Sequence, residues 1–224
     1  MFELYLDTAD IGHIARFNAC LPVRGITTNP SILAKADSGL SALLPKVAEI
    51  LGAQARIHVQ VVSASADAMV NEALTLQELP YDIVVKVPAT EIGLAAIKRM
   101  KARNIPVLAT AIYTVQQGFL AALCGADYLA PYVNRIDALG ANGVGVVADL
   151  QRLLDRHQLA STLLPASFKN TQQVLDVLKA GVASITLPAE IAAELFAHPS
   201  VQPAVDRFSQ DWQKVFGQAL SFES

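Results

Sequence analysis

The sequence has few cysteines and no long apolar run, and each shortage excludes a class of protein. Cys20 and Cys124 are its only cysteines and form no paired motif, so we expect two packed thiols in a reducing cytoplasm rather than a disulfide framework or a zinc site. No apolar stretch is long enough to span a bilayer. The first residues lack a basic region and soon turn acidic, so a signal peptide is not expected. These observations predict a soluble cytoplasmic protein that does not contact membranes.

Charge is also scarce. Charged residues make up 17% of the 224 residues, and the formal net charge is -3. The chain therefore has no basic surface of the kind that binds nucleic acid. Hydrophobic residues make up 53%, which excludes disorder and suffices for a large buried core. The low charge also indicates that part of the outer surface is covered in an assembly.

The motifs of several common chemistries are missing. There is no Walker loop and no Gly-x-Ser-x-Gly turn. The glycine-rich stretch 140–145 has the wrong spacing for a dinucleotide fingerprint, and we interpret it as a flexible loop after a strand. No metal is expected, because the histidines are scattered at spacings that match no metal motif. They are His13, His58, His157 and His198.

Short apolar runs alternate with amphipathic segments along the whole chain, and no hairpin turn separates them. Eight βα units in a chain of this length predict an α/β protein, a single (β/α)8 TIM barrel spanning residues 1–224. A doubly wound open sheet would require a glycine-rich first turn, which is missing. The predicted strands are Phe2–Leu6, Gly25–Thr28, Ile57–Val62, Ile83–Val87, Val107–Ile112, Tyr128–Val133, Thr162–Ala166 and Ser184–Leu187.

The segments between these runs carry helical patterns. Thr90 is suited to cap a helix, and Gly181 is suited to end one. The predicted buried stripes are Leu94, Ile97 and Met100; Val147, Leu150 and Leu154; and Val174, Val177 and Leu178.

Residues 199–224 exceed what eight βα units need, and we interpret them as a C-terminal helical extension. Their apolar side chains recur at helical spacing, which predicts one exposed stripe. Such a helix either covers one end of its own barrel or packs on a neighbouring subunit, and we favour the neighbour. The stripe consists of Val205, Phe208, Trp212, Val215 and Phe216.

Lys86 lies in the apolar run 83–88, which reads as a buried strand. An ammonium group is almost never fully buried without a partner, and burial lowers its pKa. A partly desolvated lysine is therefore a nucleophilic amine that can form a Schiff base with a carbonyl. The alternative is a lysine at a strand end whose amine reaches water.

Polar residues gather where seven successive strands end, which is the end of a barrel where active sites lie. Each has a structural explanation of its own: Asp7 could cap a helix that begins near Ala9, and Arg135 could pair with Asp137. His58 would fill the barrel one layer below Gln60. Together, however, they describe a site for a polyol that carries a carbonyl, since a hydroxyl-rich ligand would give every member a partner. The set is Asp7, Thr27, Thr28, Asn29, Gln60, Lys86, Thr110, Tyr132, Arg135, Ser167 and Lys169.

Six runs of the sequence, which span nearly the whole chain in order, carry a family resemblance; they are residues 4–9, 25–31, 84–88, 130–137, 166–169 and 184–188. In these runs the chain resembles the transaldolase family, and within it the fructose-6-phosphate aldolases. The resemblance implies a single barrel, a Schiff-base lysine at Lys86 and no cofactor. It also implies a homo-oligomer, a decamer of two pentameric rings in which the C-terminal helix reaches a neighbour.

Two positions bear on the choice between the branches of this family. Transaldolases usually carry a glutamate where this chain has Gln60, and a phenylalanine where it has Tyr132. The amide and the phenol found here are those of the fructose-6-phosphate aldolases. Pro165 departs from a regular strand, because proline removes a ladder donor, and it puts the direction of Ser167 in question.

The expected reaction is the reversible cleavage of fructose 6-phosphate to dihydroxyacetone and glyceraldehyde 3-phosphate. Lys86 would form the imine, and Tyr132 would move the proton through a water shared with Gln60 and Thr110. Asp7 is the second candidate for that proton transfer. The remaining expected contacts are Thr27 and Asn29 with substrate hydroxyls, and Arg135 and Ser167 with the phosphate.

Three other functions compete with this one. A transaldolase would pass the three-carbon unit to another sugar phosphate instead of releasing it. A sugar-phosphate binding barrel without turnover would bind ligand but form no covalent adduct with Lys86. An isomerase or epimerase would need a base facing the substrate carbon, and beyond Asp7 the sequence offers no good candidate.

Overall fold

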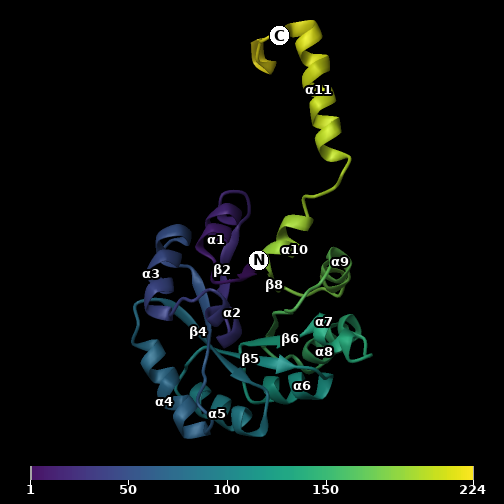
Figure 1. The fold of residues 1–224 in the computed structure, drawn as a ribbon. Coiled ribbons are helices and arrows are strands. Elements are labelled where there is room, and N and C mark those ends of the chain that lie inside the picture. Colours follow the sequence, from purple (N-terminus) through teal and green to yellow (C-terminus); the bar gives the residue numbers. More distant parts are fainter. Residues whose placement is uncertain (1, 224) are drawn as a thin grey trace.

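The computed structural model describes residues 2–223 and contains a single eight-stranded parallel sheet. The strands follow one another around the sheet in the order β8-β1-β2-β3-β4-β5-β6-β7, with helices on the outside (Figure 1). The strands are β1 (Glu3–Asp7), β2 (Val23–Thr27), β3 (Arg56–Gln60), β4 (Asp82–Pro88), β5 (Val107–Ile112), β6 (Tyr128–Pro131), β7 (Thr162–Leu163) and β8 (Ser184–Leu187).

The sheet closes between its last two strands. The backbone N–H of Thr186 donates to the carbonyl of Pro165 at 3.1 Å, and the Ser184 hydroxyl donates to the carbonyl of Leu163 at 2.8 Å. The predicted (β/α)8 TIM barrel is therefore confirmed.

The seventh predicted strand is the one that differs most from the structure. Only Thr162 and Leu163 form a regular strand, and an isolated bridge joins Ala166 to Tyr132. The interruption falls at Pro165, which has no N–H to donate to the ladder. The sixth predicted strand is also too long, because Tyr132 is already the N-cap residue of a helix.

The helices begin where the sequence supplies caps. Thr90 accepts a hydrogen bond from the backbone of Gly93 at 3.1 Å, as predicted, and Gly181 adopts a φ of +84° just after α9. The helices are α1 (Ile11–Asn18), α2 (Pro30–Lys35), α3 (Leu40–Leu51), α4 (Ala66–Gln77), α5 (Glu91–Lys101), α6 (Val115–Leu123), α7 (Val133–Ala138), α8 (Gly143–His157), α9 (Thr171–Lys179), α10 (Ala189–Glu194) and α11 (Val201–Phe216), with a 3-10 turn at Ser221–Glu223.

Three local interpretations of the sequence were wrong. Helix α1 is capped by Asp10, not by Asp7, which bonds instead to the neighbouring strand. Stretch 140–145 is not simply a flexible loop, because α8 begins at Gly143 with Asn142 as its cap. The predicted stripe of α9 includes Leu178, which is 40% exposed.

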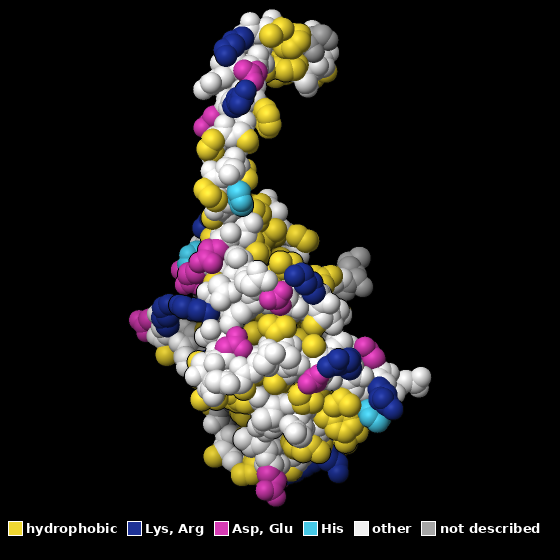
Figure 2. All heavy atoms as spheres, turned by 90° about the vertical axis from the view of Figure 1, so that its right-hand side faces the viewer, with side chains coloured by type: hydrophobic (Ala, Val, Ile, Leu, Met, Phe, Trp, Pro, Cys, Tyr) yellow, Lys and Arg dark blue, Asp and Glu magenta, His cyan; other side chains and the backbone are white. Residues whose placement is uncertain are grey.

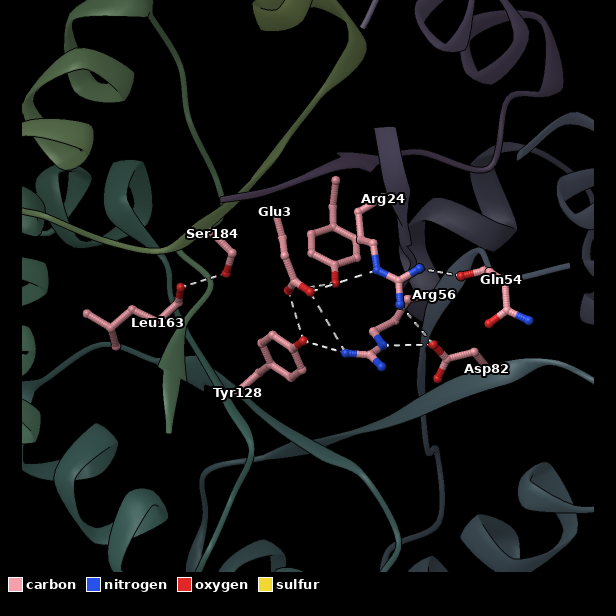
Figure 3. Close-up of polar contacts among 9 residues, drawn as sticks. Glu3, Arg24, Gln54, Arg56, Asp82, Tyr128, Leu163 and Ser184 are labelled. Atoms are coloured by element: carbon pink, nitrogen blue, oxygen red, sulfur yellow. Dashed lines mark hydrogen bonds and ion pairs between the residues drawn. The ribbon is translucent and has the colours of Figure 1, made fainter. Parts of the chain in front are cut away.

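Alternate strand residues point into the barrel, so its interior is built in layers. The layer at the N-terminal ends of the strands is a cluster of paired charges (Figure 3). Arg56 donates to Asp82 at 2.9 Å and to the Tyr128 hydroxyl at 2.7 Å, and that hydroxyl donates to Glu3 at 2.9 Å. Arg24 adds ion pairs to Glu3 and Asp82. These contacts close the end of the barrel opposite the predicted site.

The middle layer is apolar and aromatic apart from one histidine. His58 is fully buried between the rings of Tyr5 and Tyr128, at centroid distances of 4.8 and 5.2 Å. Neither of its ring nitrogens has a hydrogen-bond partner among the described residues. Burial therefore holds the pKa of His58 well below its ordinary value. The rest of the layer is Val84, Leu108, Ala130 and Leu164.

The C-terminal helix α11 stands away from the barrel (Figure 1) and has no buried residue. Its predicted apolar stripe is consequently open to solvent, with Phe208 70% and Val215 73% exposed. Figure 2 shows hydrophobic side chains gathered along this projecting helix and at its tip. No helix within residues 2–223 is long and apolar enough to cross a membrane. The cytoplasmic location stays a prediction.

Because His58 is buried in its neutral form, we expect the free energy of unfolding to fall as the pH is lowered. Below a pH of about 6.5 the unfolded chain takes up a proton on this histidine that the folded chain refuses, which lowers the free energy of unfolding by about 1.4 kcal/mol per pH unit. A His58→Phe variant should lose this part of the pH dependence. Denaturant unfolding of both proteins at pH 7 and pH 5 measures it, and any packing cost of the larger ring cancels in the comparison of slopes.

A His198→Gln variant is the control, because His198 is exposed. Its slope should match that of the parent protein. If the His58→Phe slope also matches the parent, the histidine is not buried in its neutral form.

Candidate active site

The upper layer of the barrel interior is polar, and it lies at the C-terminal ends of the strands. Strand register places Asp7 beside Thr27 and Gln60 beside Lys86. Asp7, Gln60 and Lys86 each come two positions after a residue of the middle layer, and Thr27 comes two positions after Gly25. Because side chains alternate along a strand, all four point into the barrel. The layer brings together residues that the sequence spreads over more than a hundred positions.

Lys86 is 4% exposed and its amine donates to the carbonyl of Thr28 at 2.6 Å. Thr28 is itself fixed, because its backbone N–H and its hydroxyl both donate to the carbonyl of His58, each at 3.0 Å. Desolvation lowers the pKa of Lys86, and the negative charge of Asp7 only partly offsets this. The strand-end lysine that reaches water is therefore not what the structure has.

A chain of hydroxyl contacts crosses the layer from β1 to β8. The Thr27 hydroxyl lies 2.6 Å from the Asp7 carboxylate and 2.7 Å from the Thr186 hydroxyl. Because Thr27 must donate to the carboxylate, it accepts from Thr186. Asp7 is thus held in place with one oxygen engaged, and the buried Thr27 hydroxyl is bonded to both neighbours with one acceptor lone pair left.

Tyr132 and Arg135 lie together on the other side of the layer. The Tyr132 hydroxyl is 2.8 Å from that of Thr110. The Arg135 guanidinium lies over the Tyr132 ring, 4.6 Å from its centroid, because the two residues are the N-cap and the third residue of α7. Burial raises the pKa of Tyr132, whereas the Thr110 hydrogen bond and the Arg135 charge oppose the rise. The expected pairing of Arg135 with Asp137 is absent, since Asp137 accepts from Gly143 and Gln173.

A cavity of about 450 Å³ opens at this end of the barrel. Of the predicted residues, Asp7, Asn29 and Arg135 line it. Lys86 does not line it, and its amine is bonded to the Thr28 carbonyl. The other lining residues are Thr8, Asp10, His13, Ser31, Ile32, Lys35, Ala36, Pro188, Ala189 and Glu190.

The remaining predicted residues are less closely engaged. Asn29 caps α2 through its side-chain oxygen, which accepts from Ile32 at 2.9 Å, and its amide nitrogen is left to donate to a ligand. Ser167 does not line the cavity and has a φ of +63°, a left-handed conformation uncommon for a residue other than glycine. Its carbonyl accepts from the backbone of Asn134 at 2.7 Å. Within residues 2–223, no His, Cys, Asp or Glu side chains form a group of three that could hold a metal ion.

Sequence reasoning missed two polar residues of this layer. Thr186 could have been found from the alternation of Ser184 and Thr186 in β8, which points both hydroxyls inward. Tyr113 follows β5, and its ring meets that of Tyr132 edge-on at 5.7 Å. No sequence pattern marked it, because its direction depends on a turn at Ala111, whose φ is +56°.

Residues 4–223 match the model of a family described as Transaldolase/Fructose-6-phosphate aldolase. The chain belongs to this family. The match spans nearly the whole barrel and the C-terminal helix, and it includes every residue of the polar layer. Membership of this family indicates a transaldolase- or aldolase-type activity.

The layer contains the parts that such chemistry needs. A desolvated amine can add to a ketone, and a hydroxyl pair can hold a water or a substrate hydroxyl. A guanidinium at the cavity wall can bind a phosphate.

Proposed function

We propose that the protein is a class I aldolase that reversibly cleaves fructose 6-phosphate to dihydroxyacetone and glyceraldehyde 3-phosphate. The observation that carries the proposal is the amine of Lys86, which is buried in the polar layer, has a pKa lowered by desolvation and feels the negative charge of Asp7. Desolvation disfavours the protonated form, which makes an ordinary lysine a poor nucleophile.

The first half of the reaction makes the bond-breaking possible. The free amine of Lys86 attacks the C2 ketone, and loss of water leaves a protonated imine. The C3–C4 bond then breaks with its electron pair moving into the imine, which becomes an enamine. The C4 hydroxyl loses its proton and becomes the aldehyde of glyceraldehyde 3-phosphate.

Tyr132 is the first candidate for this proton transfer. Its hydroxyl already bonds to Thr110, and the neighbouring strands carry Gln60 beside Lys86, so a water held by these groups would lie near the reacting carbons. The same water would protonate the enamine at C3, after which hydrolysis of the imine releases dihydroxyacetone. Asp7 is the second candidate, although its bond to Thr27 favours a role in orienting substrate hydroxyls.

Arg135 supplies the charge that a substrate phosphate needs. Its guanidinium borders the cavity, and burial of its flank against the Tyr132 ring leaves a fork of donors for an anion. Ser167 could add a further donor, and Thr27 and Asn29 would bind the hydroxyls of the three-carbon fragment.

The alternative is a transaldolase, which would keep the enamine until a second aldehyde takes it. Gln60 and Tyr132 support the aldolase. A phenol and an amide beside the amine can hold the protonating water, whereas the glutamate and phenylalanine usual in transaldolases would arrange it differently.

We also propose that the protein works as a homo-oligomer, a decamer of two pentameric rings. The support is α11, which projects from its own barrel and leaves a stripe of large apolar side chains without cover. Monomeric proteins rarely expose contiguous apolar patches of this kind, and a second copy of the chain is the occupant that a closed ring would provide.

Borohydride reduction in the presence of dihydroxyacetone should attach one reduced three-carbon unit to Lys86, because the imine forms there and is trapped. Peptide mass spectrometry locates the label. A Lys86→Met variant should remain folded and unlabelled. Label confined to exposed lysines such as Lys179 would rule out the imine mechanism.

Fructose 6-phosphate supplied without any acceptor separates the two branches of the family. We expect free dihydroxyacetone to accumulate, because water protonates the enamine. Release that depends on added erythrose 4-phosphate would identify a transaldolase instead.

For Tyr132→Phe we expect aldol cleavage to slow by about a hundredfold, as for the loss of a general acid–base group. The fraction of turnover that goes to transfer should rise, since the enamine survives longer. Product partitioning between free dihydroxyacetone and the transfer product measures this, with Tyr81→Phe as a control far from the cavity. Unchanged partitioning would show that the phenol does not control the outcome.

Replacing Phe208 and Val215 by glutamate should dissociate the assembly while the barrel remains folded, because the charges disrupt the apolar stripe of α11. Sedimentation velocity measures the mass of the parent and the variant. Val62→Glu is the matched control, since Val62 is also 72% exposed but lies on the barrel. A monomeric parent protein would end the proposal.

A further inference from the structure

Glu72 in α4 holds the loop that leaves the polar layer after Gln60. Its carboxylate accepts from the backbone N–H of Val62, which lies 3.1 and 3.2 Å from the two oxygens. The backbone N–H and the hydroxyl of Ser63 donate to the same carboxylate at 3.1 and 2.8 Å. Hydrogen bonds to a charged acceptor are stronger than neutral ones, so this half-buried carboxylate fixes the path of the loop.

Packing contributes little to this stretch of the chain. The Val62 side chain is 72% exposed, and Ala64 and Ser65 are exposed as well. Glu72 lies in the second turn of α4, a helix that buries its apolar side against the barrel. Its hydrogen bonds therefore tie an exposed loop to a packed helix, and they order the loop where burial does not.

The other end of the loop is joined to the strand that carries Lys86. Gln60 lies beside Lys86 in the register of β3 and β4. The next residue, Val61, is buried, and its backbone N–H donates to the Lys86 carbonyl at 3.0 Å. The backbone at Gln60 is thus fixed against β4 on one side and held by Glu72 two residues later.

The side chain of Gln60, in contrast to its backbone, is unengaged. It is half-buried, and its amide forms no hydrogen bond within residues 2–223. An inward-pointing amide without a protein partner requires a water or a ligand to satisfy it. A fixed backbone that carries such an amide provides a preorganised water site, because little remains to be ordered when the water binds.

We propose that Glu72 is a positioning residue that sets the place of the Gln60 amide, and through it the water that carries protons to and from the enamine. This inference rests on the proposed aldolase function. Glu72 touches no substrate in this scheme and acts through the loop. Its loss should slow proton transfer at the enamine carbon, leave imine formation at Lys86 intact, and shift turnover from release toward transfer.

Deuterium exchange into dihydroxyacetone in D2O isolates this proton transfer. The imine at Lys86 loses a C–H proton to become the enamine, the enamine takes up a deuteron from solvent, and hydrolysis returns labelled dihydroxyacetone. For Glu72→Ala we expect the exchange rate to fall about tenfold, because a small misplacement of a catalytic group has effects of this order. The extent of borohydride trapping at Lys86 should change by less than about twofold, because the imine equilibrium depends on the amine and not on the Gln60 amide.

Two further variants keep the comparison specific. Glu72→Gln retains one side-chain oxygen as an acceptor, so its exchange rate should lie between those of the parent and Glu72→Ala. It also supplies the comparison if the alanine variant does not fold. Glu78→Ala is the matched control, since Glu78 is an exposed carboxylate at the end of α4 whose side chain forms no hydrogen bond within residues 2–223. Its exchange rate should match the parent.

A double-mutant cycle with Gln60→Ala shows whether Glu72 acts through Gln60. Once the amide is gone, Glu72→Ala should lower the exchange rate no further. Additive losses, an unchanged exchange rate in Glu72→Ala, or an equal loss of exchange and trapping would each overturn the proposal. If the parent protein forms no adduct at Lys86 with dihydroxyacetone, the proposed function itself fails, and the two failures are thereby distinguished.

Discussion

The burial of one amine constrains the rest of this barrel. Lys86 is buried and, among the described residues, its amine is bonded to the Thr28 carbonyl, so its charged form is disfavoured and its neutral form is a nucleophile. An uncompensated charge at this depth would be costly, and the negative charge of Asp7 moderates the cost. The threonine hydroxyls of the layer have partners of their own, namely Asp7 and Thr186 for Thr27, the His58 carbonyl for Thr28 and Tyr132 for Thr110.

Much of this arrangement could be predicted from the sequence. The order of apolar runs predicted the eight strands, because a parallel barrel buries its strands on both faces. Alternation along β4 then predicted that Lys86 points inward, and the same rule applied to β3 predicted His58 in the layer below Gln60. These inferences succeeded because they depend only on the period of the strand. The family resemblance added the likeness to the transaldolases, and the match over residues 4–223 confirms it.

Several of the failures involve competition between alternative partners. Asp7 had a helix nearby to cap, yet it bonds to Thr27 on the next strand. Arg135 had Asp137 two positions away, yet it lies over Tyr132, because Asp137 is captured by the start of α8. The position of Tyr113 depends on a left-handed turn made without glycine, for which a single sequence carries no mark. Such choices are settled by packing between elements, which local pattern does not encode.

The apolar layer that contains His58 also affects how substrates and products would reach and leave the site. It lies between the amine and the paired charges at the other end, so a ligand would approach the amine from the end of the barrel that carries the cavity. A ketose attached to Lys86 would have its aldehyde-forming half toward that end and its three-carbon half at the bottom. If the proposed aldolase reaction takes place here, the outer fragment would depart first, and an incoming aldehyde would arrive after the ketone is anchored. A barrel that is packed shut at the end opposite its site would thus impose sequential rather than random release.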